Sequence, residues 1–248
     1  MTFRIKFAKY GNLKFLSHLD VMRFFQKAIR RAEIDIKYSE GYHPHQIMSF
    51  AAPLGVGQTS EGEYFDMELN SYTSEEDIFN RLNQEMPEGF RVISAHLLPD
   101  VEVGQKHTSV MALVKASDYI VQKKGEQEIS LTNEEFLGKF REFVKNDEIF
   151  ITRKSKAKAG EVTENVSPYI YEVRTDAVPT EFCTNYNSGI CMYLMLSAGG
   201  ENHVRPELLM KSFCEYAGIP FDPYDYYVHR LDSYTYADGK YVSVNDFS

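Results

Sequence analysis

The sequence predicts an α+β fold made of two ferredoxin-like (βαββαβ) units in tandem, with antiparallel sheets and helices on one face of each sheet. Two observations favour this class. Short segments alternate apolar and polar residues, which is typical of half-buried strands, and longer segments with helical spacing lie between them. The order of these segments fits the βαββαβ pattern twice, although no repeat is visible at the level of individual residues.

The first domain is expected over residues 1–100. Residues 3–9 alternate apolar and mostly basic side chains, which predicts the first strand. Ser17, followed three residues later by Asp20, has the spacing of a capping box and predicts a helix that ends near Ala32. Two helices on one face of the sheet would leave the other face free to bind a ligand. The other expected elements are strands over 46–52, 63–69 and 90–98, and a helix from Ser74 to Met86.

The second domain is expected over residues 108–248, after a polar segment at 99–108. The Asp238-Gly239 pair favours a tight hairpin turn between the last two strands. The expected elements are a strand over 110–121, a helix from Thr132 to Val144, strands over 148–154 and 161–175 around a lysine-rich turn, a strand over 191–197, a helix from Pro206 to Gly218, and a hairpin over 226–244.

Composition limits the function classes. Of the 248 residues, 43% are hydrophobic and 25% are charged, which indicates a globular chain. The formal net charge of −9 excludes a uniformly basic nucleic-acid binder. The three cysteines lack zinc-binding spacing and are expected to be reduced thiols. No apolar run is long enough to span a bilayer, and the first residues already form a strand pattern, so we expect a cytoplasmic protein without membrane contact.

Positive charge is concentrated near the amino terminus. Residues 1–48 contain nine Lys or Arg and four Asp or Glu, so their net charge is 9 − 4 = +5. The remaining residues contain 18 basic and 32 acidic side chains, which gives 18 − 32 = −14. This polarity predicts an anionic partner for one surface of the protein.

Two basic clusters are candidate contacts for RNA phosphates. The first lies on the outer face of the predicted helix 17–32 and is followed by two histidines, and the second lies on the lysine-rich turn. A solvated helix face, a turn role for the histidines and a strand-protecting loop are the alternative interpretations, and they stay open. The candidate residues are Arg23, Lys27, Arg30, Arg31, His43, His45, Arg153, Lys154, Lys156 and Lys158.

Motifs for catalysis or cofactors are not found in the sequence. The segment 55–62 is glycine-rich but lacks the Gly-Lys-Ser/Thr end of a P-loop. His18 and His43 are expected at opposite ends of the first helix, which argues against a shared metal site. We therefore assign no catalytic residue, no metal and no cofactor.

Several segments resemble one bacterial family. Residues 13–24, 38–45, 49–57 and 60–69 are similar to the signature of the radical SAM-linked domain family, a domain of unknown function. Residues 153–156 and 204–206 match it loosely. The resemblance implies a radical SAM protein as partner, and an RNA-linked role, because genes for RNA metabolism are common neighbours. The chain lacks the C-x-x-x-C-x-x-C cluster motif, so it resembles the partner of the radical enzyme.

The leading hypothesis is a non-catalytic accessory protein that binds tRNA or rRNA and works with a radical SAM enzyme. A protein–protein adaptor that docks the radical SAM partner is the first alternative. A histidine-dependent endoribonuclease-like enzyme, in which His18 or His43 serves as the acid or base, is the second, and it rests on fold analogy alone.

Overall fold

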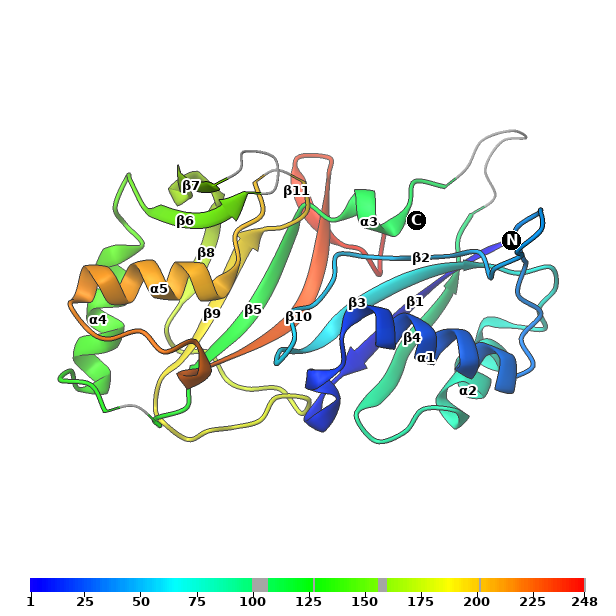
Figure 1. The fold of residues 1–248 in the computed structure, drawn as a ribbon, viewed down its shortest axis with the longest axis horizontal. Helices are drawn as coiled ribbons and strands as arrows, with labels where there is room; N and C mark the ends of the chain where they lie inside the picture. The colour runs from blue at the N-terminus through cyan, green and yellow to red at the C-terminus, as the bar shows by residue number, and fades with distance from the viewer. Residues whose placement is uncertain (100–106, 127, 156–159, 201, 248) are drawn as a thin grey trace. The chain divides into compact units, whose positions relative to one another are not determined.

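The computed structural model describes residues 1–248 except 100–106, 127, 156–159, 201 and 248 (Figure 1). The fold is mixed α+β, with mostly antiparallel strand pairing and few helices. The chain divides into two compact units. Unit 1 contains residues 1–115 and 230–248, and unit 2 contains residues 116–229. The predicted domain boundary at 100–108 falls largely outside the described residues and stays a prediction.

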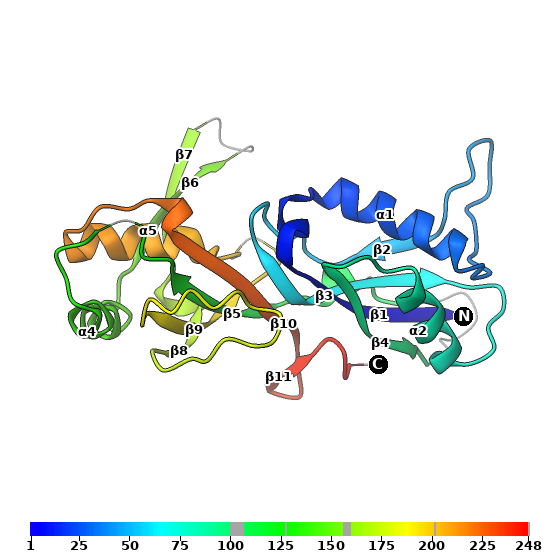
Figure 2. The same ribbon diagram turned by 90° about the horizontal axis from the view of Figure 1, so that it is seen from below.

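Unit 1 is an antiparallel sheet with its two long helices packed on one face. Its elements are β1 (Thr2–Lys9), α1 (His18–Arg31), β2 (Met48–Phe50), β3 (Thr59–Glu68), α2 (Glu75–Gln84), β4 (Phe90–Leu97), α3 (Val110–Leu113), the later part of β10 (Tyr226–Ala237) and β11 (Lys240–Ser243). The strand order is β4–β1–β3, and both β2 and β10 also pair with β3. Phe3, Ile5 and Phe7 of β1 share one hydrophobic core with α1 and α2. Figure 2 shows α1 running along this side of β1 and β3.

Helix α1 forms where the sequence predicts it. The Ser17 hydroxyl accepts a hydrogen bond from the backbone N–H of Asp20 at 3.3 Å, which satisfies one of the free donors of the first turn. Val21, Phe25 and Ile29 are buried and lie four residues apart, so they form the face that packs on the sheet. The opposite face is exposed to solvent and carries most of the helix's positive charge.

Unit 2 has a second antiparallel arrangement with its own core. Its elements are β5 (Ala116–Lys123), α4 (Asn133–Phe143), β6 (Phe150–Ser155), β7 (Gly160–Asn165), β8 (Ile170–Arg174), β9 (Cys191–Ser197), α5 (Pro206–Ala217) and the first residues of β10. The strand order is β10–β5–β9–β8, and β6 and β7 form a separate two-stranded ribbon. The helix predicted to begin at Thr132 does so, and the side chains of Thr132 and Glu135 form a capping box at the start of α4. Gly218 ends α5 in the left-handed conformation, as its position after an apolar helix predicts.

Two sequence-based expectations about strands are wrong. Val110–Leu113 begins the predicted strand 110–121 but forms the short helix α3, whose first N–H donates to the carboxylate of Asp66 at 3.2 Å. This contact with a residue distant in sequence outweighs the strand propensity of the segment. The predicted strand 161–175 is split into β7 and β8 by a 3₁₀ turn at Ser167–Tyr169, because Pro168 has no N–H for a sheet ladder.

The face of the unit 1 sheet opposite the helices is also not free. Arg4 and Asp66 point to this face but are 3% and 6% exposed. The Arg4 guanidinium donates to both carboxylate oxygens of Asp66, at 2.9 and 3.2 Å. It also donates to the carbonyl oxygens of Val244 and Phe247, so the carboxy-terminal segment covers this part of the sheet.

Candidate nucleic-acid interface

All four cations that the sequence assigns to the outer face of α1 are exposed: Arg23, Lys27, Arg30 and Arg31. Two of them have acidic neighbours. Arg23 lies 3.8 Å from the carboxylate of Asp20, and Arg31 lies 2.5 Å from that of Glu85. Lys27 and Arg30 make no ion pair or side-chain hydrogen bond within the described residues. An exposed ion pair contributes only about 0–1 kcal/mol, so Arg23 and Arg31 can exchange their partners for phosphate.

Most other cations of the first 48 residues are neutralised, which corrects the sequence-based picture of a free positive charge. Arg4 is paired with Asp66, Lys6 with Asp232 at 3.0 Å, and Lys37 with Glu68 at 3.1 Å. The basic surface is therefore smaller than the count of +5 suggests, and it centres on α1.

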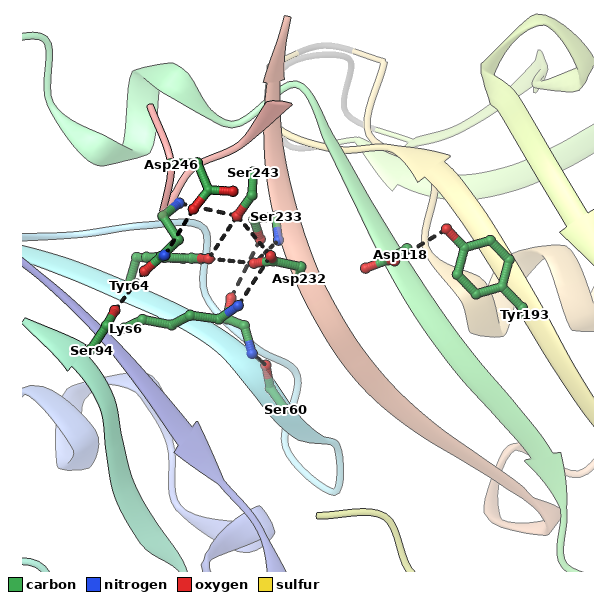
Figure 3. Close-up of polar contacts among 12 residues, drawn as sticks. Lys6, Ser60, Tyr64, Ser94, Asp118, Tyr193, Asp232, Ser233, Ser243 and Asp246 are labelled. Carbon is green, nitrogen blue, oxygen red and sulfur yellow. Dashed lines mark hydrogen bonds and ion pairs between the residues drawn. The ribbon is translucent and has the colours of Figure 1, made fainter. Parts of the chain in front are cut away.

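The Lys6 pair belongs to a polar network in unit 1 (Figure 3). The Tyr64 hydroxyl donates to Asp232, and the Ser243 hydroxyl donates to the other oxygen of the same carboxylate at 2.8 Å. Burial and the Asp232 charge raise the pKa of Tyr64, so its hydroxyl stays protonated as a donor. This network fixes the carboxy-terminal strand, and it leaves Lys6 unavailable for an external anion.

The two histidines lie on a hairpin attached to α1. The N–H of Ser39 donates to the carbonyl of His45, and the hydroxyl of Ser39 is 2.8 Å from its ring Nδ1. The side-chain amide of Gln46, at the base of the hairpin, donates to the Gln26 carbonyl of α1 at 3.2 Å. His43 is exposed, and the neighbouring Tyr42 is fully exposed. We call residues 38–46 the tyrosine hairpin; its composition predicts a turn, but its attachment to α1 is visible only in the structure.

The second basic cluster lies in unit 2. Arg153 is part-buried and donates to both oxygens of Glu164, at 2.7 and 3.1 Å, which raises the pKa of its guanidinium. The side chain of Lys154, as well as Lys156 and Lys158, lies outside the described residues. Arg153 thus links β6 to β7. The part of this cluster that the structure describes contains no cation available for phosphate.

A buried charge cluster at one end of α1 is not predicted by the sequence. Lys9 is 2% exposed, and its Nζ donates to the carbonyl of Leu16 at 3.2 Å. Glu63 pairs with Arg230 at 3.0 Å. Burial lowers the pKa of Lys9, and burial likewise lowers the pKa of His18 at the start of the helix. Glu63 and Arg230 are 167 residues apart in the chain, so no local sequence pattern could reveal their contact.

The structure does not bring the candidate histidines together. His18 is the first residue of α1, whereas the hairpin that holds His43 bonds to Gln26, which is about 12 Å further along the helix axis. Among the described residues, no group of three His, Cys, Asp or Glu side chains could hold a metal ion. The three cysteines are free thiols. Within the same part of the chain, no helix combines the length and hydrophobicity needed to cross a membrane.

The protein has an α+β fold, and its candidate site is the exposed basic face of α1. A family described as "Uncharacterized protein conserved in bacteria (DUF2344)" matches residues 2–206. The chain belongs to this family, whose description makes no reference to radical SAM chemistry. No curated protein matches the chain.

Two solved structures show weak similarity. One is described as a crystal structure of an unknown protein from Galdieria sulphuraria. Its sequence is 12% identical, the match covers 94% of this chain and 97% of that protein, and the TM-score is 0.24. The other is a heavy metal efflux pump, 10% identical with a TM-score of 0.23, and the match covers 95% of this chain but 28% of the pump. Both TM-scores are too low to support an argument about fold or function.

Proposed function

We propose that the protein binds single-stranded RNA through the outer face of α1 and the tyrosine hairpin, as a non-catalytic accessory protein. One observation carries the proposal. Lys27 and Arg30 are exposed without an acidic partner in the described chain, on a helix that is hydrogen-bonded to the hairpin holding the fully exposed Tyr42. Cations that follow a phosphate backbone, beside aromatic rings that stack on bases, are typical of surfaces that bind single strands.

A loop region of tRNA or rRNA fits this surface better than a regular duplex does. Sequence-tolerant stacking needs unpaired bases that can turn away from their neighbours, and a duplex keeps them inside the helix. The cations supply the sequence-independent part of the affinity. His43, which is exposed on the same hairpin, can add a further hydrogen bond or a stacking contact.

We expect the double variant Lys27→Ala/Arg30→Ala to bind RNA more weakly and with less dependence on salt. Each lost phosphate contact lowers the slope of log affinity against log salt by about 0.7 for a single strand, so two contacts should lower it by about 1.4. Binding of a fluorescent tRNA or rRNA fragment is measured by anisotropy at several salt concentrations. The matched control is Arg141→Ala/Lys145→Ala, which removes two exposed cations from unit 2. Equal losses in both variants, or no binding by the wild type, would contradict the proposal.

Tyr42→Ala should weaken binding in a different way. Loss of one stacked base costs about 1–3 kcal/mol of binding free energy and removes no charge, so the salt slope should stay at the wild-type value. Tyr224→Ala is the control, because Tyr224 is 78% exposed on another part of the chain. An affinity unchanged by Tyr42→Ala would exclude the hairpin from the interface.

The proposal also includes a radical SAM protein as partner, which the resemblance of residues 13–24 and 38–45 implies. An exposed apolar patch supports a docking role: Phe15, Leu19 and Val56 are 60–65% exposed. The N–H of Gly57 donates to the carbonyl of Lys14 at 2.8 Å, so the loop with Val56 lies beside this end of the helix. Val56→Asp, which changes the patch outside α1, should abolish co-purification with the radical SAM protein and leave RNA binding intact. Retention of both would argue against docking at this patch.

We further infer that each unit is ferredoxin-like. The strand order β4–β1–β3–β2 in unit 1 and the order β10–β5–β9–β8 in unit 2 support this inference, because each follows the βαββαβ pattern with two helices between its strands. An experimental structure with another strand order in either unit would contradict it.

A further inference from the structure

The segment that joins β8 to β9 crosses one face of the unit 2 sheet. We call residues 175–190, which contain no helix or strand, the strap. Gln122 of β5 holds the strap through both ends of its side-chain amide: Nε2 donates to the carbonyl of Thr184 at 2.8 Å, and Oε1 accepts from the N–H of Tyr186 at 3.2 Å. The N–H of Thr184 also donates to the hydroxyl of Tyr227 on β10 at 3.1 Å. Figure 2 shows the strap on the side of β9 away from α5.

One thiol of unit 2 lies on the face of the sheet that the strap crosses. Cys191, at the start of β9, is paired with Gln122 of β5. The side chains of directly paired residues in an antiparallel sheet point to the same face, with Cβ atoms about 4.5–5.5 Å apart. Cys191 therefore points to the face on which Gln122 binds the strap, whereas its neighbour Met192 belongs to the hydrophobic core.

A second thiol is carried by the strap itself. Cys183 directly precedes Thr184, whose carbonyl is bound to Gln122, so the backbone at Cys183 is anchored to the residue opposite Cys191. Both thiols are half-buried. Burial raises the pKa of Cys191 to about 11, and the charge of Cys183 adds to this rise, as expected for neighbouring thiols. Cys214 is separate from this pair, because it is fully buried in the core beside the helices.

A polar groove gives solutes access to the pair. Its volume is about 420 Å³, and its wall includes Cys191, Gln122 and residues from both ends of the strap. A disulfide needs Cα atoms no more than about 7 Å apart. Cys183 belongs to no strand, so the strap can supply the final approach of the two sulfur atoms without breaking a sheet ladder.

We propose that Cys183 and Cys191 form a redox modification site, which a small disulfide such as glutathione disulfide oxidises to an intramolecular disulfide that ties the strap to β9. The Cys183 thiolate attacks glutathione disulfide, forms a mixed disulfide and releases one glutathione thiolate. Cys191 loses its proton to solvent and attacks the Cys183 sulfur, which forms the protein S–S bond and releases the second glutathione thiolate. Two electrons pass from the cysteine pair to glutathione disulfide, which is reduced to two molecules of glutathione.

The order of the two steps follows from the state of the thiols. The raised pKa of Cys191 leaves little of its thiolate at neutral pH, and the thiolate is the attacking form. Cys183 therefore reacts first, and Cys191 completes the bond. The site uses none of the residues of α1 or the tyrosine hairpin, so it is a property beyond the proposed RNA binding.

The test is incubation of the full chain at increasing ratios of oxidised to reduced glutathione, followed by alkylation of the remaining thiols and chymotryptic digestion. Chymotrypsin cleaves after Tyr186, so a bond between Cys183 and Cys191 joins two peptides that mass spectrometry detects as one. We expect this linked pair in the oxidised wild type and in the control Cys214→Ser, and its loss on reduction with dithiothreitol. No linked pair in the oxidised wild type, a bond that involves Cys214, or a bond between two chains would overturn the proposal.

Two further measurements test the details of the proposal. Cys191→Ser should stop after the first step and carry one glutathione on Cys183; an unmodified Cys183 in this variant would overturn the order of attack. Hydrogen exchange at the amides of Thr184 and Tyr186 should be slower in the oxidised wild type than in the reduced protein, because the bond restricts opening of the strap. Equal exchange rates would overturn the claim that the disulfide ties the strap to β9. RNA binding should be the same in both forms, so this site and the RNA interface can fail independently.

Discussion

Asp66→Ala is expected to lower the free energy of unfolding by about 3–5 kcal/mol, because it leaves the guanidinium of Arg4 buried without its carboxylate. Arg4 is 3% exposed, so water cannot replace the missing partner. The change also removes the acceptor for the first N–H of α3. Urea unfolding followed by far-UV circular dichroism measures this loss of stability. Tryptophan fluorescence cannot be used, because the chain has no Trp.

The control for this prediction is Glu68→Ala, which breaks the exposed pair with Lys37 and should cost no more than about 1 kcal/mol. The double variant Arg4→Met/Asp66→Leu should recover most of the stability. Burial raises the pKa of the Asp66 carboxyl in spite of the neighbouring Arg4. This direction indicates that desolvation of the carboxylate costs more free energy than its attraction to Arg4 contributes. A similar loss for Asp66→Ala and Glu68→Ala would show that Arg4 is solvated in the folded protein.

Gly62→Ala should be the second strongly destabilising change. A Cβ atom at Gly62 would lie 2.4 Å from the Cα of Asp232 and 2.7 Å from the carbonyl oxygen of Leu231. Both neighbours are backbone atoms of β10, so β3 and β10 would have to separate. Overpacking of this kind costs about 1–3 kcal/mol, and a shift of two strands places the expected cost at the upper end.

Gly138→Ala is the matched control for the same substitution type. Gly138 lies in α4 with no atom within 4 Å of the added Cβ. Alanine in a helix is more favourable than glycine by roughly 0.5–1 kcal/mol, so this variant should be more stable than the wild type. Differential scanning calorimetry of both variants should therefore show Tm shifts of opposite sign. A stable Gly62→Ala protein would contradict the close approach of β3 and β10.

The sequence predicts best what depends on neighbouring residues. Ser17, Thr132 and Gly218 start or end helices through contacts within a few positions, and all three have the predicted role. The apolar spacing of Val21, Phe25 and Ile29 likewise identifies the buried face of α1. These features need no knowledge of the rest of the chain.

The partners of charged side chains could not be predicted, because they lie far apart in the sequence. Arg4 and Asp66 are separated by 62 residues, and a strand residue in an alternating pattern is normally expected to face solvent. The candidate site was therefore predicted in part. The exposure of the α1 cations follows from helical spacing and was predicted correctly. The pairing of Lys6 with Asp232 and the burial of Lys9 depend on tertiary contacts, so they could not be predicted.

Photo-crosslinking tests the central claim, RNA binding by unit 1, most directly. The protein is mixed with tRNA or rRNA fragments that contain 4-thiouridine, irradiated and digested, and the crosslinked peptides are identified by mass spectrometry. Crosslinks are expected in the tyrosine hairpin and in α1, and they should be lost in Lys27→Ala/Arg30→Ala. Crosslinks confined to residues 116–229, or crosslinks that persist unchanged in that variant, would contradict this claim.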